Sequence, residues 1–435
     1  MKKNFLILLL FILNPGSIAL LQADPPDSPD LSQNKKTGSV SDPKKYSLTS
    51  IVEEALKQSP LLASIKSRVE EKRFLSRQAG VWPNPEGSFS GGQKKVESEE
   101  GSLYETSLSQ TFLFPGKLRS RVLVAEADVE LARLSQLEVE LSLISETVRL
   151  AYDYEVNRRK KEFAQRRLER FDLVRAYLEG NIFASPQKKA ERLIVEARLR
   201  KISAERLEIK ASLLASLERL KLYLPIQGKL EIDIPWFAGN DLPDASHWQM
   251  QVNDHNPELA TQRFLVDKAR REKNLAAKEA WPDFESSIFY GRESAVETER
   301  IAGLGLSIPL PIFNRNRGTI QSLQMRIEAE EKLRDFKERE FVSRLGVLLA
   351  EIEASRQTLL KYPLSLMTDL EKDFKETEAE FRKGRMDFLL FIELENELAD
   401  TYYRSLDAQR SLAEKLTALF ALAGIKDLVS ELPKF

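Results

Sequence analysis

The sequence contains no cysteine among its 435 residues, and this absence excludes several kinds of chemistry. Disulfide bonds, thiolate metal sites, cysteine nucleophiles and a lipid-modified N-terminal cysteine all require that residue. Histidine is nearly absent too: the two copies, His247 and His255, lie in a region rich in proline and asparagine. Because a metal site needs several ligands in a defined geometry, we interpret both as surface or turn residues. We expect neither a resident metal nor a cofactor.

A surplus of positive charge is also missing. Lys plus Arg is 66 and Asp plus Glu is 67, which gives a formal net charge of -1. Because phosphate backbones require a basic surface, nucleic acid is not an expected partner.

Catalytic motifs are missing as well. Gly116-Lys117 lacks the upstream glycine of a phosphate-binding loop, because Thr111 stands at that position. Acidic pairs such as Glu393 and Glu395 lie in a segment full of charges, so general acid–base chemistry is a weak interpretation. We expect that the chain is not an enzyme.

Long apolar runs are absent apart from a short one at the start. Met1-Lys2-Lys3 is positive, Phe5–Leu13 is apolar, and small residues follow at Ala19 and Ala23. This layout predicts a secretory signal peptide over residues 1–23, cleaved at one of those alanines. The run is shorter than the roughly 20 residues that a membrane-spanning helix needs, so any membrane insertion would use β-strands.

Residues 24–46 are rich in proline, aspartate, serine and lysine, and we expect a flexible leader there. Ordered structure is predicted to begin near Ser47. The spacing of Ser50 and Glu53 predicts a capping box at the start of the first helix.

The remaining sequence is dominated by an internal repeat. Each copy has a Ser-Pro or Asn-Pro pair, a helix, a Trp-Pro pair, two strand-like stretches, a proline-containing break and long helices. The Trp-Pro pairs are Trp82-Pro83 and Trp281-Pro282. We therefore predict two structural repeats, at residues 47–240 and 241–424, followed by a C-terminal tail at 425–435.

The helices are predicted to be very long. No proline or glycine occurs from Lys117 to Glu179, which as a helix would span roughly 95 Å. Apolar residues recur at steps of three and four, as in a coiled coil, and a second long helical stretch is expected after the second break. Gly180 and Gly384 each separate two such stretches, so they are predicted to turn antiparallel hairpins.

The strand-like stretches alternate between apolar and small or polar residues. Leu304, Leu306 and Ile308 share one face, with Gly303 and Gly305 on the other. This pattern is typical of a transmembrane β-barrel with lipid-facing leucines, and also of a soluble sheet with one wet face. Bacterial barrels begin at about eight strands, and four strands alone would leave open edges. The strands therefore predict an oligomer.

Taken in order, these motifs carry a family resemblance. The duplicated Ser/Asn-Pro helix starts and Trp-Pro pairs, the break from Gln110 to Lys117 and the break from Pro309 to Gly318 all contribute. From about Leu48 to Gly424 the chain resembles TolC-like outer-membrane efflux proteins. The two breaks are most similar to the outer-membrane component of heavy-metal cation efflux systems of the RND type.

The resemblance implies a mainly α fold with a small β part. Long helical hairpins would form a periplasmic α-barrel. Four strands from each chain would contribute to a trimeric 12-stranded transmembrane β-barrel in the outer membrane. Residues near 224–248 and the tail would form a belt. The homotrimer would contact outer-membrane lipid and would passively export divalent heavy-metal cations, delivered by an inner-membrane pump and a periplasmic adaptor.

The resemblance also implies roles for individual residues. Tyr177, Gly180, Phe381, Gly384 and Asp387 would form adaptor-docking hairpin tips. Glu393 would narrow the resting aperture, whereas Leu390 occupies the place of a second acidic residue in some relatives. Two alternatives remain open: drug or solvent efflux, or a type I secretion outlet of the same fold; and a soluble periplasmic coiled-coil scaffold.

Overall fold

A computed structural model describes residues 44–96, 99–179, 185–225, 230–294 and 297–432. The predicted signal peptide lies outside these residues, as does Gly180. The end of the predicted leader needs a correction. Lys44–Ser47 forms a short strand, β1, which pairs in parallel with β4, Leu230–Asp233. Regular structure in the described residues therefore includes the three residues before Ser47.

The same series of elements occurs twice along the chain. Two helices, a β-hairpin and long helices come first, and the second series repeats this order with one more helix. The first series is α1 (Leu48–Gln58), α2 (Pro60–Ala79), β2 (Glu86–Val96), β3 (Glu99–Phe112), α3 (Lys117–Glu179) and α4 (Pro186–Leu220). The second is α5 (Ala245–His255), α6 (Pro257–Glu279), β5 (Phe284–Ser294), β6 (Thr298–Ser307), α7 (Arg317–Lys361), α8 (Leu364–Arg382) and α9 (Phe388–Leu422). A short α10 (Leu428–Glu431) follows in the tail.

The Ser-Pro and Asn-Pro pairs begin helices for a local reason. Proline at the first helical position lacks an N–H that would be unpaired there, and the preceding side chain caps a free N–H. Asn256 Oδ1 accepts from the Leu259 N–H at 2.7 Å, and Ser59 Oγ accepts from the Leu62 N–H at 3.3 Å. The capping box predicted at Ser50 is wrong. The N-cap of α1 is Ser47, whose Oγ accepts from the Ser50 N–H at 3.1 Å.

The predicted uninterrupted helix is confirmed in the first series, whereas the second long helical stretch is divided in two. α3 runs over 63 residues, from Lys117 to Glu179. Its counterpart stops at Lys361, and α8 begins at Leu364, after Tyr362-Pro363. Proline has no N–H to continue the helical ladder, and its ring disfavours helical backbone at the preceding residue, so the second stretch divides here.

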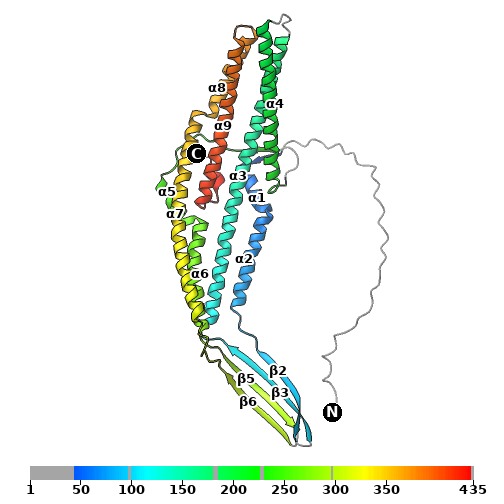
Figure 1. Ribbon diagram of the computed structural model, residues 1–435, viewed down its shortest axis with the longest axis vertical. Coiled ribbons are helices and arrows are strands. Elements are labelled where there is room, and N and C mark those ends of the chain that lie inside the picture. The colour runs from blue at the N-terminus through cyan, green and yellow to red at the C-terminus, as the bar shows by residue number, and fades with distance from the viewer. Residues whose placement is uncertain (1–43, 97–98, 180–184, 226–229, 295–296, 433–435) are drawn as a thin grey trace, which may run out of the picture. The chain divides into compact units, whose positions relative to one another are not determined.

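The strands of the sheet and the helices next to them are arranged side by side in the same order. The four-stranded sheet is antiparallel, with the order β2-β3-β5-β6. α2 packs on α3, α3 on α6, and α6 on α7, so the adjoining helices follow the same order (Figure 1). Within one chain, β2 and β6 are therefore edge strands, and α2 and α7 are edge helices.

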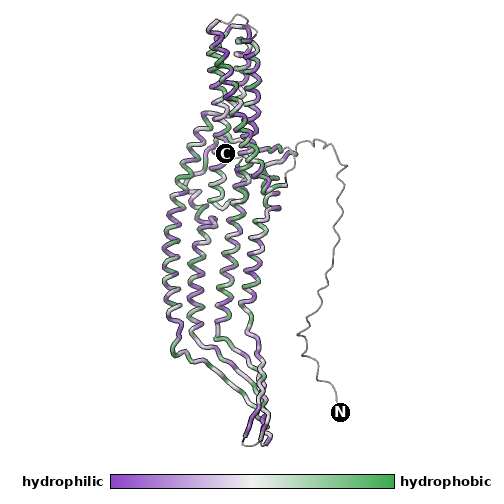
Figure 2. Tube along the Cα trace, turned by 45° about the vertical axis from the view of Figure 1, so that its right-hand side comes forward, coloured by the Kyte–Doolittle hydropathy of each residue, from purple (hydrophilic) through white to green (hydrophobic). Residues whose placement is uncertain are grey.

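Two apolar clusters hold the helices together. The first joins α1, the middle of α3, the end of α9, β4, α5 and the C-terminal tail, and includes Ile51, Tyr152, Ile232, Trp248, Leu416 and Leu428. The second lies between α3 and α4 and between α8 and α9, and includes Phe163, Phe171, Ile202, Phe374, Phe381 and Phe391. The predicted helix pairing around Gly384 is confirmed, because α8 packs on α9. Figure 2 shows apolar and polar residues alternating along these helices.

Candidate functional site

The turn between α8 and α9 is built by two residues with defined backbone roles. Gly384 has a φ of +71°, a left-handed conformation that glycine adopts without a Cβ penalty. The Gly384 N–H donates to Phe381 O and the Arg385 N–H donates to Glu380 O, which is a Schellman ending. Asp387 then caps α9, because its Oδ1 accepts from the N–H groups of Leu389 and Leu390. The turn is therefore locally specified.

The side chains at this tip divide into supporting and exposed ones. Phe381 is buried and its ring stacks on that of Phe391, with centroids 4.4 Å apart. It therefore supports the turn from inside, and its side chain is not available for the adaptor contact that the resemblance implied. Asp387 is exposed, as are Lys383 and Arg385. At the other tip, Tyr177 lies in the last turn of α3.

Glu393 lies on an exposed face of α9, one turn beyond the tip. Glu397 and Asp400 continue the same face at helical spacing and are also exposed. The sequence analysis singled out Glu393 and missed the other two, although their spacing of four and three residues was a readable signal. Whether these acids narrow an aperture stays a prediction.

A buried ion pair lies in the second apolar cluster. Arg167 of α3 donates to both carboxylate oxygens of Glu395 of α9, at 2.8 and 3.0 Å. Glu205 of α4 is a further partner at 3.3 Å. The Glu395 side chain is fully buried. This pair therefore links both helical hairpins through one guanidinium group.

The surroundings of Arg167 favour its charge. Burial alone would lower the pKa of Arg167, but the hydrogen bonds and negative charge of Glu395 outweigh it, and the pKa is raised. For Arg170, one turn away, burial dominates and lowers the pKa. Its guanidinium lies 4.9 Å from the Phe374 ring centroid.

The sheet has two chemically different faces. Directly paired residues share a face, so Leu108, Ile288 and Leu304 form one row across three strands. Phe112 pairs with Phe284 on the same face, with ring centroids 5.1 Å apart. The opposite face carries mainly serines, glutamates and glycines, such as Ser107, Ser287 and Gly305, together with the apolar residues Leu103, Phe289 and Ile301.

In the single chain, side chains on the apolar face of the sheet are exposed to solvent. Leu304 is 83% exposed and Leu306 is 69% exposed. One boundary is wrong: Ile308 lies beyond β6, which ends at Ser307. Pro309 and Pro311 follow, and proline cannot continue the ladder of backbone bonds. Ile308 is exposed too, but it is not a strand residue.

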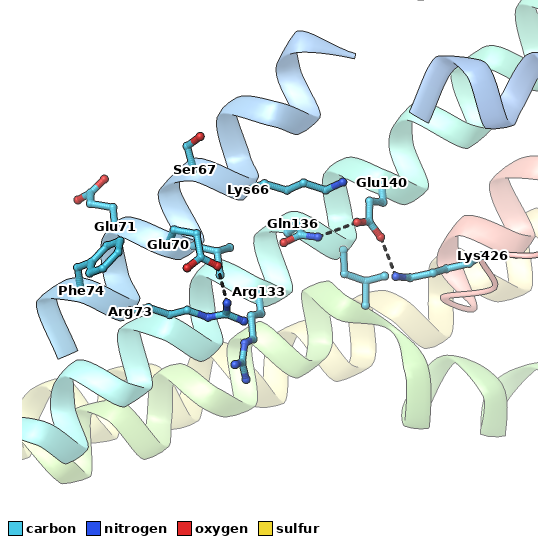
Figure 3. Close-up of a pocket in the computed structure, with 12 residues that line it drawn as sticks. Lys66, Ser67, Glu70, Glu71, Arg73, Phe74, Arg133, Gln136, Glu140 and Lys426 are labelled. Carbon is cyan, nitrogen blue, oxygen red and sulfur yellow. Dashed lines mark hydrogen bonds and ion pairs between the residues drawn. The ribbon is translucent and has the colours of Figure 1, made fainter. Parts of the chain in front are cut away.

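A groove of about 790 Å³ lies between α2 and α3 (Figure 3). Lys426 donates to Glu140 at 2.7 Å and Gln136 does so at 2.8 Å. Burial would raise the pKa of Glu140, but these hydrogen bonds outweigh it and the pKa is lowered. The groove mixes both charge signs with the exposed ring of Phe74. It holds no nucleophile–base pair, and its position on an edge helix suits contact with another chain.

Both histidines lie in helix α5, and both side chains are exposed, in agreement with their interpretation as surface residues. Within the described residues, no group of three or more His, Cys, Asp or Glu is arranged to hold a metal ion. In the same part of the chain, no helix is long and apolar enough to cross a membrane.

This architecture defines a class: residues 44–432 have the fold of outer-membrane efflux channels. The Neisseria gonorrhoeae MtrE outer membrane channel in its open state has a TM-score of 0.72 at 16% identity, over 87% of this chain and 88% of that one. A CusC structure has a TM-score of 0.70 at 14% identity, over 86% and 91% of the two chains. The outer membrane protein VceC of Vibrio cholerae has a TM-score of 0.67 at 16% identity, over 87% of this chain and 96% of that one.

Sequence comparison points the same way. Residues 248–425 match the family described as outer membrane efflux protein. A comparison with curated protein sequences gave no match. The matched family and the structural neighbours are channels rather than enzymes, in agreement with the expectation that the chain is not an enzyme.

Proposed function

We propose that the whole chain is an outer membrane efflux protein and forms the passive exit duct of a tripartite efflux system. The observation that carries this proposal is the sheet, with one apolar face, one polar face, and no buried side chain in the described residues of its strands. An apolar face outside and a polar face inside suit a water-filled conduit through lipid.

The two open edges support assembly of several copies. The edge helix α2 exposes Phe74 and Leu75, and the edge helix α7 exposes Leu333 and Phe336. Because the patches at the two edges differ, one edge of a chain would contact the opposite edge of the next. Such head-to-tail contacts form a closed ring when the rotation between neighbouring chains divides a full turn evenly. Three copies would place β2 of one beside β6 of the next and complete a sheet of twelve strands. The two repeats predicted from the sequence would then give this ring a pseudo-sixfold order.

The helical hairpins would extend into the periplasm, where their tips would meet an adaptor. The local definition of the 384–387 turn supports this role, because a docking surface needs a fixed backbone. An inner-membrane pump would supply the energy. Divalent heavy-metal cations are the proposed cargo, on the basis of the two proline-containing breaks. The predicted signal peptide would direct the chain across the inner membrane.

Deletion of the protein, followed by growth on graded zinc, cobalt, cadmium, copper, silver, dyes and detergents, tests this function. We expect sensitivity to the divalent metals, restored by the wild-type chain. Sensitivity to dyes and detergents alone would replace the metal cargo by drugs or solvents. Full recovery of the protein in the soluble periplasmic fraction would instead support the coiled-coil scaffold.

A further inference from the structure

Two arginines stand directly opposite each other near the far end of the sheet. Arg292 in β5 pairs with Arg300 in β6, seven residues of register away from the helix-side pair Glu285 and Ser307. Both lie on the apolar face, because Ile288 and Leu304 form the paired row four residues closer to the helices. The apolar face therefore ends in a pair of guanidinium groups.

Within the described residues, no acidic side chain forms an ion pair with either arginine. Like charges directly opposite in a sheet repel each other. The neighbouring acids Glu293 and Glu299 occupy the opposite face, and Glu293 pairs there with Lys94. The two positive charges are thus available to a common anion.

The position of the pair indicates where that anion would come from. Below it, the apolar face runs from Phe284 to Tyr290, about 20 Å along the strand. Tyr104 lies opposite Arg292 on β3 and Tyr290 lies in the next row. Aromatic residues followed by basic ones mark the level of lipid headgroups. Because this end is remote from the helices, it would face the outer leaflet (Figure 1).

We propose that Arg292 and Arg300 together bind a phosphate group of an outer-leaflet lipid. This inference rests on the proposed function, since it requires the apolar face to be embedded. Guanidinium groups hold phosphate oxygens through paired, charge-assisted hydrogen bonds. The acyl chains of the same molecule would lie along Ile288 and Leu304. The site therefore selects a phosphorylated lipid over free phosphate, which lacks the apolar contact.

The full-length mature protein, extracted from membranes in a mild detergent, provides the test. Native mass spectrometry would measure retention of bisphosphorylated lipid A, its dephosphorylated form, and lipid A in the presence of millimolar inorganic phosphate. We expect wild type to prefer the phosphorylated form at least about tenfold, as two charge-assisted hydrogen bonds allow. Arg292→Gln/Arg300→Gln should lose this preference. Arg292→Lys/Arg300→Lys should retain part of it, because the charge remains.

Lys94→Gln is the matched control, since it removes a positive charge at a similar height on the other face; it should leave the preference unchanged. Equal preference in the Arg292→Gln/Arg300→Gln variant and wild type would overturn the site. Displacement of the lipid by inorganic phosphate would overturn the assignment to lipid. A wild-type protein that is embedded but does not discriminate between the lipids refutes this inference alone. A wild-type protein absent from the membrane refutes the proposed function as well.

Discussion

The sheet and the hairpin helices of this chain differ in how far their side chains are buried. In the helical hairpins, aromatic and aliphatic side chains such as Phe163, Phe171 and Phe391 are fully buried. In the sheet, backbone pairing is complete between neighbouring strands, yet every described side chain stays at least partly exposed.

The difference shows whether the apolar side chains of each region are buried within one chain or need another partner to cover them. The hairpins bury an apolar cluster and the Arg167–Glu395 pair within one chain. The sheet is incomplete, since no described residue covers its exposed apolar face or pairs with its two edge strands. Substitutions in the sheet should therefore act on membrane assembly, and those in the hairpins on helix stability.

The largest expected effect comes from charges on the apolar face. Leu304→Arg/Leu306→Arg should prevent stable insertion, because each arginine near the midplane costs about 2–4 kcal/mol. The amount of protein in detergent-extracted outer membranes would be compared with wild type. Ser90→Arg/Gly92→Arg is the matched control, at two alternate exposed positions on the polar face. Normal insertion of the leucine variant would show that the faces have been assigned the wrong way round.

Removal of Glu395 should have the next largest effect. Glu395→Ala leaves the buried Arg167 with Glu205 alone, and should cost about 3 kcal/mol of helical stability or more. Denaturant unfolding followed by far-UV circular dichroism would measure it. Glu196→Ala breaks an exposed pair with Arg192 and should cost less than about 1 kcal/mol. Similar losses in both variants would mean that the buried pair has no special role.

Two glycines should respond in opposite directions. Gly384→Val places a branched side chain at positive φ and should cost about 1–2 kcal/mol, with weaker adaptor binding. Gly346→Ala lies within α7 with open space around its Cβ position, and should gain about 0.5–1 kcal/mol. Thermal melting and adaptor pull-down would compare the two. If Gly384→Val left metal resistance unchanged, the tip would not be part of the adaptor-docking surface.

The smallest effect concerns Glu138 of α3. Burial raises its pKa, although a hydrogen bond from Thr261 at 3.3 Å opposes the shift. Ionisation is therefore harder in the folded protein, and the wild type loses some stability as pH rises through the folded-state pKa. Glu138→Gln should match wild type below about pH 4 and exceed it slightly at pH 7, by less than about 0.5 kcal/mol.

The melting temperature as a function of pH measures this difference. Glu126→Gln, at an exposed position on the same helix, makes the same change in net charge and serves as the control. A Glu138→Gln variant that is less stable than wild type at pH 7 would show that the hydrogen bond from Thr261 outweighs burial.

Sequence periodicity predicted features that depend on near neighbours. The extent of α3 follows from the absence of proline and glycine, and the two faces of β6 follow from alternation at Leu304 and Leu306. Features that join distant segments were missed. Arg167 and Glu395 are 228 residues apart, and neither spacing nor composition pairs them. The same holds for β1 with β4.

Local chemistry also produced errors where two signals competed. Ser50 fits a capping box, but Ser47 precedes it and caps the helix. Ile308 continues the alternation, but the prolines after it end the strand. In the second long stretch, Pro363 lacks the N–H that would continue the helix, and the stretch divides there.

The oligomeric state of the membrane-extracted protein tests the central claim, that other copies complete the sheet. Native mass spectrometry of the wild-type mature chain, released from outer membranes by mild detergent, should find three chains per particle with bound detergent or lipid. A folded single chain recovered entirely without detergent would contradict this account, because its open edges and apolar face would then be stable in water.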